Sequence, residues 1–362
     1  MNEVLLTVSG QIDPHVEDQV KCGDRPEPDY LRMARVFHAD LVDYKAAKIK
    51  SGAIGKILEI IGGKNLSLAW TCYLLRHKYR VIFTDGEQVG IPLAFLLKYA
   101  NHRSRPFHFM ISHILSVGKK MILLDQLGLC SHIDIFFVYS SWQKSFIENR
   151  WKISSNRVVY TPFMVDTDFF SPEQAHSEIA MNLAWNGKPL ICAVGLEFRD
   201  YPTLIEAVRG MDIQVVIAAA SPWSKRRDST QGQQIPENVT IQRFTQYELR
   251  DLYAASNFLV MPLYPVNFQA GVTAILEAMS MGKAVVCSRI PGQTDVVVDN
   301  ETGVYISPGD SSILREVIKN LLNQPFTIEK MGYSGRERVL NVMSLDCYVN
   351  RLNNYVQAAI KV

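Results

Sequence analysis

The 362-residue sequence contains no apolar run that approaches the roughly 18 residues of a membrane-spanning helix. Its six cysteines include no C-x-x-C pair, and no His/Cys cluster has metal-ligand spacing, which disfavours a disulfide framework or a zinc site. No predicted strand is followed by G-x-G-x-x-G, which argues against a dinucleotide-dependent dehydrogenase. Internal repeats, low-complexity tracts and aromatic-basic motifs are also missing, and nucleic acid is therefore not an expected partner.

The charge of the chain is unevenly distributed, although the formal net charge is only +2. Residues 1–165 hold 21 Lys and Arg against 15 Asp and Glu, whereas the remaining residues hold 17 against 21. The basic half could attract a phosphorylated substrate or an anionic membrane surface. The alternative is that this excess charge only keeps the domain soluble. The first ten residues lack the basic region and cleavage site of a signal peptide, so we expect a strand there and a cytoplasmic protein.

Short apolar runs alternate with helical patterns along the whole chain, which predicts an α/β protein with parallel sheets. The first half predicts strands at 4–9, 80–84, 107–112, 133–140 and 158–163, and helices near 28–37, 45–61, 66–77, 89–100, 117–127 and 141–151. The second half predicts strands at 189–194, 213–219, 239–243, 257–261, 284–288 and 303–307, and helices at 201–209, 246–255, 271–281, 310–323 and 326–341. We expect an N-terminal domain over 1–165, a C-terminal domain over 166–343 and a final helix, 344–362, that returns to the first domain.

The stretch over 262–282 is the one around which the chain is organised. Apolar runs at 257–261 and 284–288 flank it, as two buried strands of a parallel sheet require. Good helix formers lie between Gly271 and Gly282, which stand where a helix should begin and end. A helix that starts from a glycine loop at the carboxyl end of a buried strand presents unpaired N–H groups and a positive dipole end. These features attract an anion, most often a phosphate.

Polar side chains accompany this predicted anion site. Glu277 lies about two turns into the helix and Thr273 one turn before it on the same face. A carboxylate there could accept hydrogen bonds from both hydroxyls of a ribose. Gln269 precedes the helix. The alternative is that Glu277 is a solvated helix residue and Gln269 a loop residue.

The second half, taken in order, resembles a known family. The segments that carry the resemblance are VGLEFRDYPTLIEAV at 194–208, TQYELRDLYAASNFLVMPL at 245–263, QAGVTAILEAMSMGKAVVCS at 269–288 and DNETGVYISPGD at 299–310. They are similar to the nucleotide-sugar domain of retaining family 4 glycosyltransferases, whose motif is Glu, seven residues, Glu. Gln269 and Glu277 have this spacing, with Gln in place of the first Glu. The resemblance covers roughly 140–362 and implies the GT-B fold: two Rossmann-like parallel-sheet domains facing a central cleft.

The resemblance implies that the second domain binds a nucleoside diphosphate sugar, with a UDP-sugar as the expected donor and no cofactor. Glu277 matches the glutamate that holds the ribose, and Gln269 the residue that touches the sugar. Leu196 and Tyr201 stand where the family usually has two cations that clamp the diphosphate, and Arg199 is the nearest substitute. The candidate donor-binding residues are Gly10, Gly195, Arg199, Lys225, Thr245, Gln269, Ala270, Gly271, Val272, Thr273 and Glu277.

The first domain contributes further candidates. His113 follows an apolar strand and is similar in setting to a histidine that family members place near the donor sugar, although a lone histidine is more often structural. Asp85 and Glu87 are candidates for orienting an acceptor hydroxyl. With His113, Arg199 and Gln269 as catalytic residues, the chain is predicted to be a retaining hexosyltransferase.

The implied reaction moves the sugar to a hydroxyl of a small molecule, a glycan or a lipid-linked acceptor, without a metal ion. Negative charge on the leaving diphosphate is stabilised by the helix N-terminus and a cation. One alternative is a non-catalytic nucleotide-sugar-binding subunit, which the departures at Gln269 and Leu196 favour. Another is a different GT-B enzyme, such as a sugar-nucleotide epimerase, which would need acid and base carboxylates that this motif does not supply.

Overall fold

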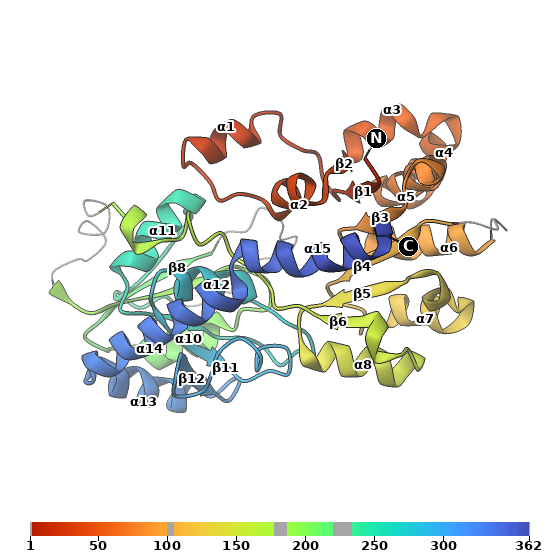
Figure 1. Cartoon of the computed structure of the whole chain (residues 1–362). Helices are drawn as coiled ribbons and strands as arrows, with labels where there is room; N and C mark the ends of the chain where they lie inside the picture. Colours follow the sequence, from red (N-terminus) through yellow and green to blue (C-terminus); the bar gives the residue numbers. More distant parts are fainter. Residues whose placement is uncertain (1, 100–104, 177–186, 220–233, 362) are drawn as a thin grey trace. The chain divides into compact units, whose positions relative to one another are not determined.

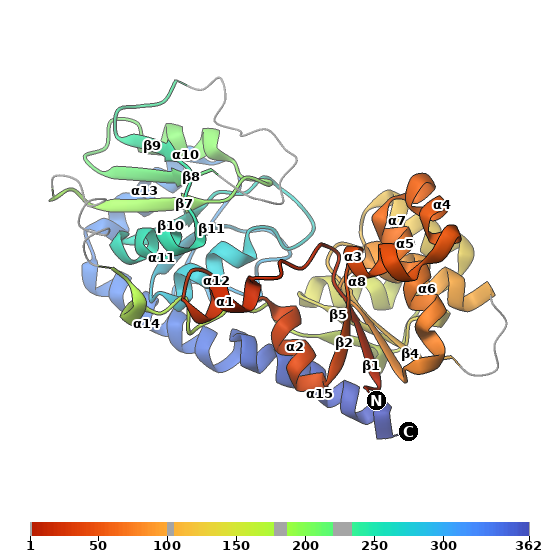
Figure 2. The same ribbon diagram turned by 90° about the horizontal axis from the view of Figure 1, so that it is seen from above.

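The computed structural model describes residues 2–99, 105–176, 187–219 and 234–361 (Figure 1). The chain forms two compact units, each with its own parallel sheet (Figure 2). The first unit contains Met1–Asp18, Glu27–Pro162 and Asp346–Val362, and the second contains Gln19–Pro26 and Phe163–Leu345. The predicted α/β class with two parallel sheets is confirmed.

The sheet of the first unit has the strand order β2-β1-β3-β4-β5-β6, and every neighbouring pair is parallel. Its strands are β1 (Val4–Thr7), β2 (Ala39–Val42), β3 (Val81–Thr84), β4 (Phe107–Ser112), β5 (Ile135–Val138) and β6 (Val158–Tyr160). Its helices are α2 (Asp29–Phe37), α3 (Tyr44–Lys50), α4 (Gly52–Gly62), α5 (Lys64–Leu75), α6 (Glu87–Tyr99), α7 (Gly118–Leu127) and α8 (Ser141–Trp151). Helix α15 (Leu345–Lys361) belongs to this unit from Asp346 onward.

The sheet of the second unit has the order β12-β11-β10-β7-β8-β9 and is also parallel throughout. Its strands are β7 (Leu190–Val194), β8 (Gln214–Ala218), β9 (Val239–Gln242), β10 (Phe258–Met261), β11 (Ala284–Ser288) and β12 (Gly303–Ile306). Its helices are α10 (Tyr201–Val208), α11 (Gln246–Ala255), α12 (Val272–Ser280), α13 (Ser311–Leu322) and α14 (Pro325–Arg338), followed by a π turn, Val339–Met343.

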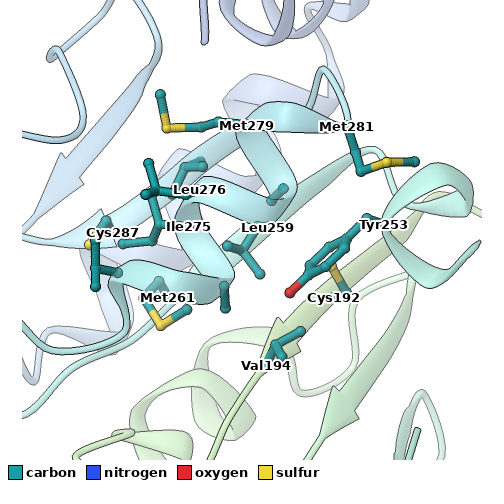
Figure 3. Close-up of a cluster of buried hydrophobic side chains, with 14 of the residues drawn as sticks. Cys192, Val194, Tyr253, Leu259, Met261, Ile275, Leu276, Met279, Met281 and Cys287 are labelled. Carbon is teal, nitrogen blue, oxygen red and sulfur yellow. The ribbon is translucent and has the colours of Figure 1, made fainter. Parts of the chain in front are cut away.

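Two apolar clusters lie on opposite faces of the second sheet, because successive side chains of a strand point to opposite faces. Leu190, Cys192 and Val194 of β7 pack in the cluster that contains α11 and α12. Ile191 and Ala193 pack in the cluster that contains α10 and α13. Figure 3 shows part of the first cluster, where side chains of α12 meet those of β7 and β10.

Some elements differ from the prediction. The helix expected over 45–61 is divided into α3 and α4, because Gly52 takes a left-handed φ of 66°. Strand β2 was not predicted, since this edge strand of four residues has only one buried side chain. Helix α1 (Val16–Lys21) was also missed, and the second unit begins at Phe163 and not at residue 166. Among the described residues, no helix is both long and apolar enough to cross a lipid bilayer.

Candidate functional site

The candidate site of the second unit lies where the strand order reverses. Strand β7 is first in sequence within this sheet, and its neighbours in the sheet are β8 on one side and β10 on the other. The loops that leave the carboxyl ends of β7 and β10 lead to α10 and α12, which pack in different apolar clusters. Open α/β sheets bind ligands at such a point. This places residues 195–200 and 262–271 at the expected binding position.

The loop after β7 is shaped by two left-handed residues, Gly195 with φ 101° and Phe198 with φ 60°. It turns the Arg199 side chain back over the strand end, where its Nε donates to Val194 O (2.8 Å) and its Nη1 to Glu197 O (2.6 Å). A backbone bridge joins Arg199 to Leu263 of the loop after β10. The two loops are therefore held together at the residue that carries the positive charge.

Two glycines make room for the Arg199 guanidinium. A Cβ atom on Gly195 would lie 3.0 Å from Arg199 Cζ, and one on Gly271 would lie 3.3 Å from the same atom. Both glycines also have positive φ values, which other residues rarely adopt. Arg199 is 7% exposed, and burial lowers the pKa of its guanidinium from the usual value. Since an arginine stays protonated in proteins, the structure holds a buried positive charge against the first turn of α12.

Helix α12 starts without the side-chain cap that its neighbours have. Its N-cap residue is Gly271, which makes no side-chain hydrogen bond. By contrast, α10, α11 and α13 begin with caps from Asp200, Thr245 and Asp310. The first N–H groups of a helix have no intrahelical acceptor, and the dipole makes this end positive. Together with Arg199, the start of α12 is suited to bind a phosphate group.

Glu277 lies on α12 with its carboxylate largely buried, at 6% exposure. Burial raises the pKa of Glu277 to about 7, although the hydrogen bond from Tyr253 Oη to its Oε2 (2.8 Å) acts in the opposite direction. Tyr253 reaches it from α11 and is fully buried in the same apolar cluster (Figure 3). Thr273, one turn before Glu277, is exposed. A buried carboxyl group anchored by a tyrosine can accept hydrogen bonds from a ligand's hydroxyl groups.

The backbone around Gln269 is held by residues that were not predicted. A Cβ on Gly292 would overlap the backbone N of Gln269, so this turn approaches the loop as closely as glycine allows. The fully buried Gln293 donates from its Nε2 to Ala270 O, and Tyr305 Oη donates to Gln293 O (2.6 Å). The Pro291-Gly292 pair after β11 marks a turn, but its contact with Gln269 needs the tertiary fold.

The candidate Thr245 and the two positions that lack the family's cations, Leu196 and Tyr201, have structural surroundings. Thr245 is exposed and caps α11 in a reciprocal capping box with Glu248, which is a structural role. Tyr201 is fully buried, and its hydroxyl donates to Gly195 O, so it fixes the glycine turn. Leu196 packs at the edge of the cluster that contains α10. Lys225 lies outside the described residues, as do Arg226 and Arg227.

In the first unit, Asp85 joins the ends of β1 and β3, the point at which that sheet's strand order reverses. Its carboxylate accepts from Thr7 Oγ1 (2.5 Å), from Ser9 Oγ (2.9 Å) and from Ser9 N. Burial raises the pKa of Asp85, while these hydrogen bonds act to lower it. With three donors already bound, Asp85 mainly fixes the loop that follows β1.

Glu87 is almost completely buried, with 1% exposure. It accepts from the N–H groups of His113 (2.9 Å) and Ile114 (3.0 Å) and from Lys120 Nζ (2.6 Å). Burial alone would raise the pKa of Glu87, but the charges of His113 and Lys120 and these hydrogen bonds hold it below its usual value. With these three donors Glu87 shapes the loop that carries His113. That it also orients an acceptor hydroxyl stays a prediction.

His113 is exposed at the end of β4 and is not a core histidine. Its Nε2 lies 2.9 Å from Asp85 O, so this nitrogen carries the proton in the neutral ring and Nδ1 is the acceptor. Its ring lies 5.4 Å from that of Tyr139. The core histidine of this strand is His108. It is fully buried, and burial lowers its pKa to about 4.

Asp29 was not predicted, yet it lies at the start of α2 close enough to interact electrostatically with Asp85 and His113. Burial raises the pKa of Asp29, and the neighbouring Asp85 raises it further. The sequence offers no signal for Asp29 beyond its place at a helix start. Gly10 has no atom within 4 Å of a Cβ built on it, so no close approach requires glycine there.

Comparisons with solved structures match this fold over almost the entire chain. Sucrose-phosphate synthase from Thermosynechococcus elongatus superposes with a TM-score of 0.71 at 15% identity and covers 99% of both chains. Anabaena Alr3699/HepE, solved in complex with UDP-glucose, superposes with a TM-score of 0.67 at 13% identity and covers 98% of this chain and 99% of its own. The chain has the GT-B fold.

Sequence comparisons match a shorter part of this GT-B chain. Residues 194–324, most of the second unit, match the family described as Glycosyl transferases group 1. The capsular polysaccharide biosynthesis glycosyltransferase CapM of Staphylococcus aureus is 28% identical over 109 residues, which are 30% of this chain and 28% of the relative. The D-inositol 3-phosphate glycosyltransferase of Corynebacterium diphtheriae is 33% identical over 94 residues, which are 26% of this chain and 21% of the relative. The matched segments thus span well under half of these relatives.

Within the described part of this GT-B chain, no group of three His, Cys, Asp or Glu side chains is arranged to hold a metal ion. The sequence contains one D-x-D triplet, Asp166-Thr167-Asp168, which the prediction of metal independence did not take into account. Asp166 Oδ1 accepts from the N–H groups of Asp168 (3.1 Å) and Phe169 (3.2 Å). This carboxylate therefore closes a local turn at the start of the second unit.

Proposed function

We propose that the chain is a glycosyltransferase that moves a sugar from a nucleoside diphosphate sugar to an acceptor hydroxyl with retention of anomeric configuration. The observation that carries the proposal is the Arg199 guanidinium, buried between Gly195 and Gly271 at the uncapped start of α12. A diphosphate bound there would meet both the cation and the N–H groups of the first helical turn.

This arrangement stabilises the leaving group in the proposed reaction. The bond between the anomeric carbon and the phosphate oxygen breaks, a bond to the acceptor oxygen forms on the same face, and the acceptor proton passes to the departing phosphate. Negative charge therefore grows where Arg199 and α12 are already positioned, which lowers the barrier without reorganisation. Ala270 to Thr273 supply the backbone of this cradle.

The ribose and the sugar of the donor are assigned to residues on either side of the diphosphate cradle, further along α12 or before its start. Glu277 binds the ribose hydroxyls, which explains a carboxyl group buried among apolar side chains and anchored by Tyr253. UDP is the proposed nucleotide, in keeping with the UDP-glucose complex of the structurally similar Alr3699/HepE. Gln269 contacts the sugar, and its amide can donate as well as accept.

In the first unit, His113 is proposed to contact the transferred sugar through its exposed ring, whose Nε2 is held by Asp85 O. Glu87 holds the backbone N–H of the same residue. The acceptor is proposed to be a small molecule, a glycan or a lipid-linked sugar. Neither Asp29 nor Asp85 is assigned the role of a general base, because the departing phosphate takes the proton.

The deciding experiment is a panel of UDP-, GDP-, ADP- and TDP-sugars. The correct donor should raise the melting temperature, since a ligand at a hundred times its dissociation constant adds about 2.7 kcal/mol of stability. Release of the matching nucleoside diphosphate with a candidate acceptor then tests transfer. Gln269→Glu should change the ratio of kcat/KM between two donors with the same nucleotide by about tenfold, because one polar contact to the sugar is exchanged. An unchanged ratio would place Gln269 outside the sugar site.

A non-catalytic nucleotide-sugar-binding subunit is the second candidate. Leu196 and Tyr201 provide no charge, and Tyr201 is fully buried, so the described part of the diphosphate site has Arg199 as its cation. Such a subunit would show the same thermal stabilisation by a donor as the enzyme. It would release no nucleoside diphosphate with any acceptor that the enzyme class uses.

A further inference from the structure

Helix α4 is amphipathic in the opposite sense to an ordinary surface helix. Gly55 is the buried residue of this helix, Leu58 and Glu59 are partly buried, and a Cβ added to Gly55 would overlap Ser51 and lie 3.4 Å from Ser67 Oγ of α5. Its outward side carries the large apolar residues, namely Ile54 (53% exposed), Ile57 (55%), Ile60 (85%) and Ile61 (76%). A helix that only packed on its own domain would bury these isoleucines.

Three of the exposed isoleucines lie along one face of α4. Ile54, Ile57 and Ile61 are spaced i, i+3 and i+7, which places them on one face of α4. Ile49, near the end of the preceding α3, is also 76% exposed. Gly55, whose Cβ position faces Ser67 Oγ of α5, lies on the opposite side of α4 from Ile54, Ile57 and Ile61. We call residues 44–64 the isoleucine-lysine face.

The charges on this face are almost all positive. Its lysines are Lys45, Lys48, Lys50, Lys56 and Lys64, and all five are exposed. Glu59 is the acidic residue within the same range and is partly buried. A surface that exposes both aliphatic side chains and lysines complements a bilayer with anionic headgroups, because the aliphatic groups enter the interface and the lysines are attracted to the negative surface.

We propose that the isoleucine-lysine face docks on an anionic phospholipid surface, with α4 lying in the plane of the interface. Its composition separates a membrane from a protein partner. Protein interfaces are enriched in aromatic residues, Met and Arg and depleted in Lys, whereas this face exposes isoleucines and lysines. The inference does not depend on the proposed transferase activity, because binding is measured without turnover.

The test uses the full chain in co-sedimentation with vesicles of phosphatidylcholine, with and without phosphatidylglycerol. The wild type should bind the anionic vesicles, and raised salt should weaken this binding. Ile57→Gln/Ile61→Gln should lower the partition coefficient about tenfold or more, as should Lys48→Gln/Lys56→Gln. The matched control is Phe326→Gln/Tyr333→Gln on α14, where two exposed apolar side chains (84% and 68%) lie outside this face and should be dispensable.

Melting temperatures show whether each variant is folded, and Ile60→Gln, at the most exposed of the four positions, replaces the double variant if that one unfolds. The proposal is overturned if the wild type ignores anionic vesicles, or if the isoleucine variant binds them as well as the wild type does. It is also overturned if sedimentation velocity shows a concentration-dependent dimer that the isoleucine variant abolishes. The face would then be an interface between two copies of the chain.

Discussion

Arg199 is the residue on which the proposed diphosphate site depends most directly. Arg199→Lys keeps a positive charge but loses the planar fork, and a lysine cannot reproduce both backbone hydrogen bonds that aim the guanidinium at α12. We expect kcat to fall about tenfold or more, while stability falls by about 1 kcal/mol. Steady-state kinetics and thermal melting measure the two effects. Arg209→Lys is the control, at an exposed arginine paired with Glu206; if both variants retain full turnover, the charge that stabilises the diphosphate lies elsewhere.

Glu277 should link stability to pH. Its folded-state pKa of about 7 lies above the value of a free glutamate, so the protonated form favours folding. This contribution is fully present below about pH 4.5 and is lost as pH rises through about 7, with a total of up to about 3 kcal/mol. Glu277→Gln should therefore melt higher than the wild type at pH 8 but not at pH 5, without nucleotide. The same variant should bind UDP more weakly, and equal melting temperatures at pH 8 would show that the carboxyl group is not destabilised by burial.

His113 and His108 form a natural pair for separating a site residue from a core residue. His113→Ala should keep the melting temperature and lose turnover by about tenfold or more, because it removes a contact to the sugar from an exposed side chain. His108→Ala should lower the melting temperature, since it removes the buried ring that pairs with both Thr84 Oγ1 and His132 O. His77→Ala, at an exposed histidine of the same unit, should change neither quantity. A loss of stability in His113→Ala with activity intact would assign His113 a structural role.

At the scale of the element, a substitution of Gly271 tests whether the start of α12 binds the diphosphate. Gly271→Ala introduces a side chain at φ 76°, 2.8 Å from Met261 Sδ and 3.3 Å from Arg199 Cζ. Gly309→Ala is a matched control, because it has the same sign of φ (77°) but no atom within 4 Å. Both should lose about 1 to 2 kcal/mol through backbone strain. Gly271→Ala alone should also weaken UDP binding in calorimetry, and equal affinities in the two variants would separate α12 from the diphosphate.

The elements of this chain were predictable where local sequence determines them. The stretch over 257–288 was predicted in outline as strand, glycine loop, helix and strand, because buried parallel strands and glycine-bounded helices have local patterns. Strand β2 has no such pattern, and the break at Gly52 depends on a left-handed residue inside a helical sequence. The contacts of Gly292 and Gln293 with Gln269 and Ala270 join residues more than twenty positions apart, so no local pattern could predict them.

At the scale of the whole molecule, the order of strands in each sheet could not be read from the sequence. The neighbours β7 and β10 are separated by two strands and by 63 residues between Val194 and Phe258. What the sequence did indicate was the alternation that makes a parallel sheet necessary, and ligand binding at strand ends follows from that class of fold. The residues that close the site, such as Tyr253 beside Glu277, depend on the sheet order.

The first unit should be unstable without α15, the helix that the end of the sequence contributes to it. Tyr348, Leu352 and Val356 of α15 are fully buried, and Tyr348 Oη lies 3.1 Å from Tyr139 Oη. A fragment of residues 1–162 would expose the surface that these side chains cover, and we expect it to aggregate or melt well below the complete chain. Joining residues 346–361 to the fragment through a flexible linker should restore a cooperative transition in circular dichroism. A fragment that melts as cooperatively alone would show that α15 is dispensable.

The position of α15 at the end of the sequence also determines the order in which the two units can complete folding during synthesis. A ribosome releases residues 1–162 first, yet the first unit remains open on one side until residues 346–361 have emerged, after the whole second unit has been made. The second unit has all the residues of its sheet sooner and can close while synthesis continues. The half of the protein that is begun first is therefore finished last, and a chaperone that recognises exposed apolar surface would find it on the first unit throughout elongation.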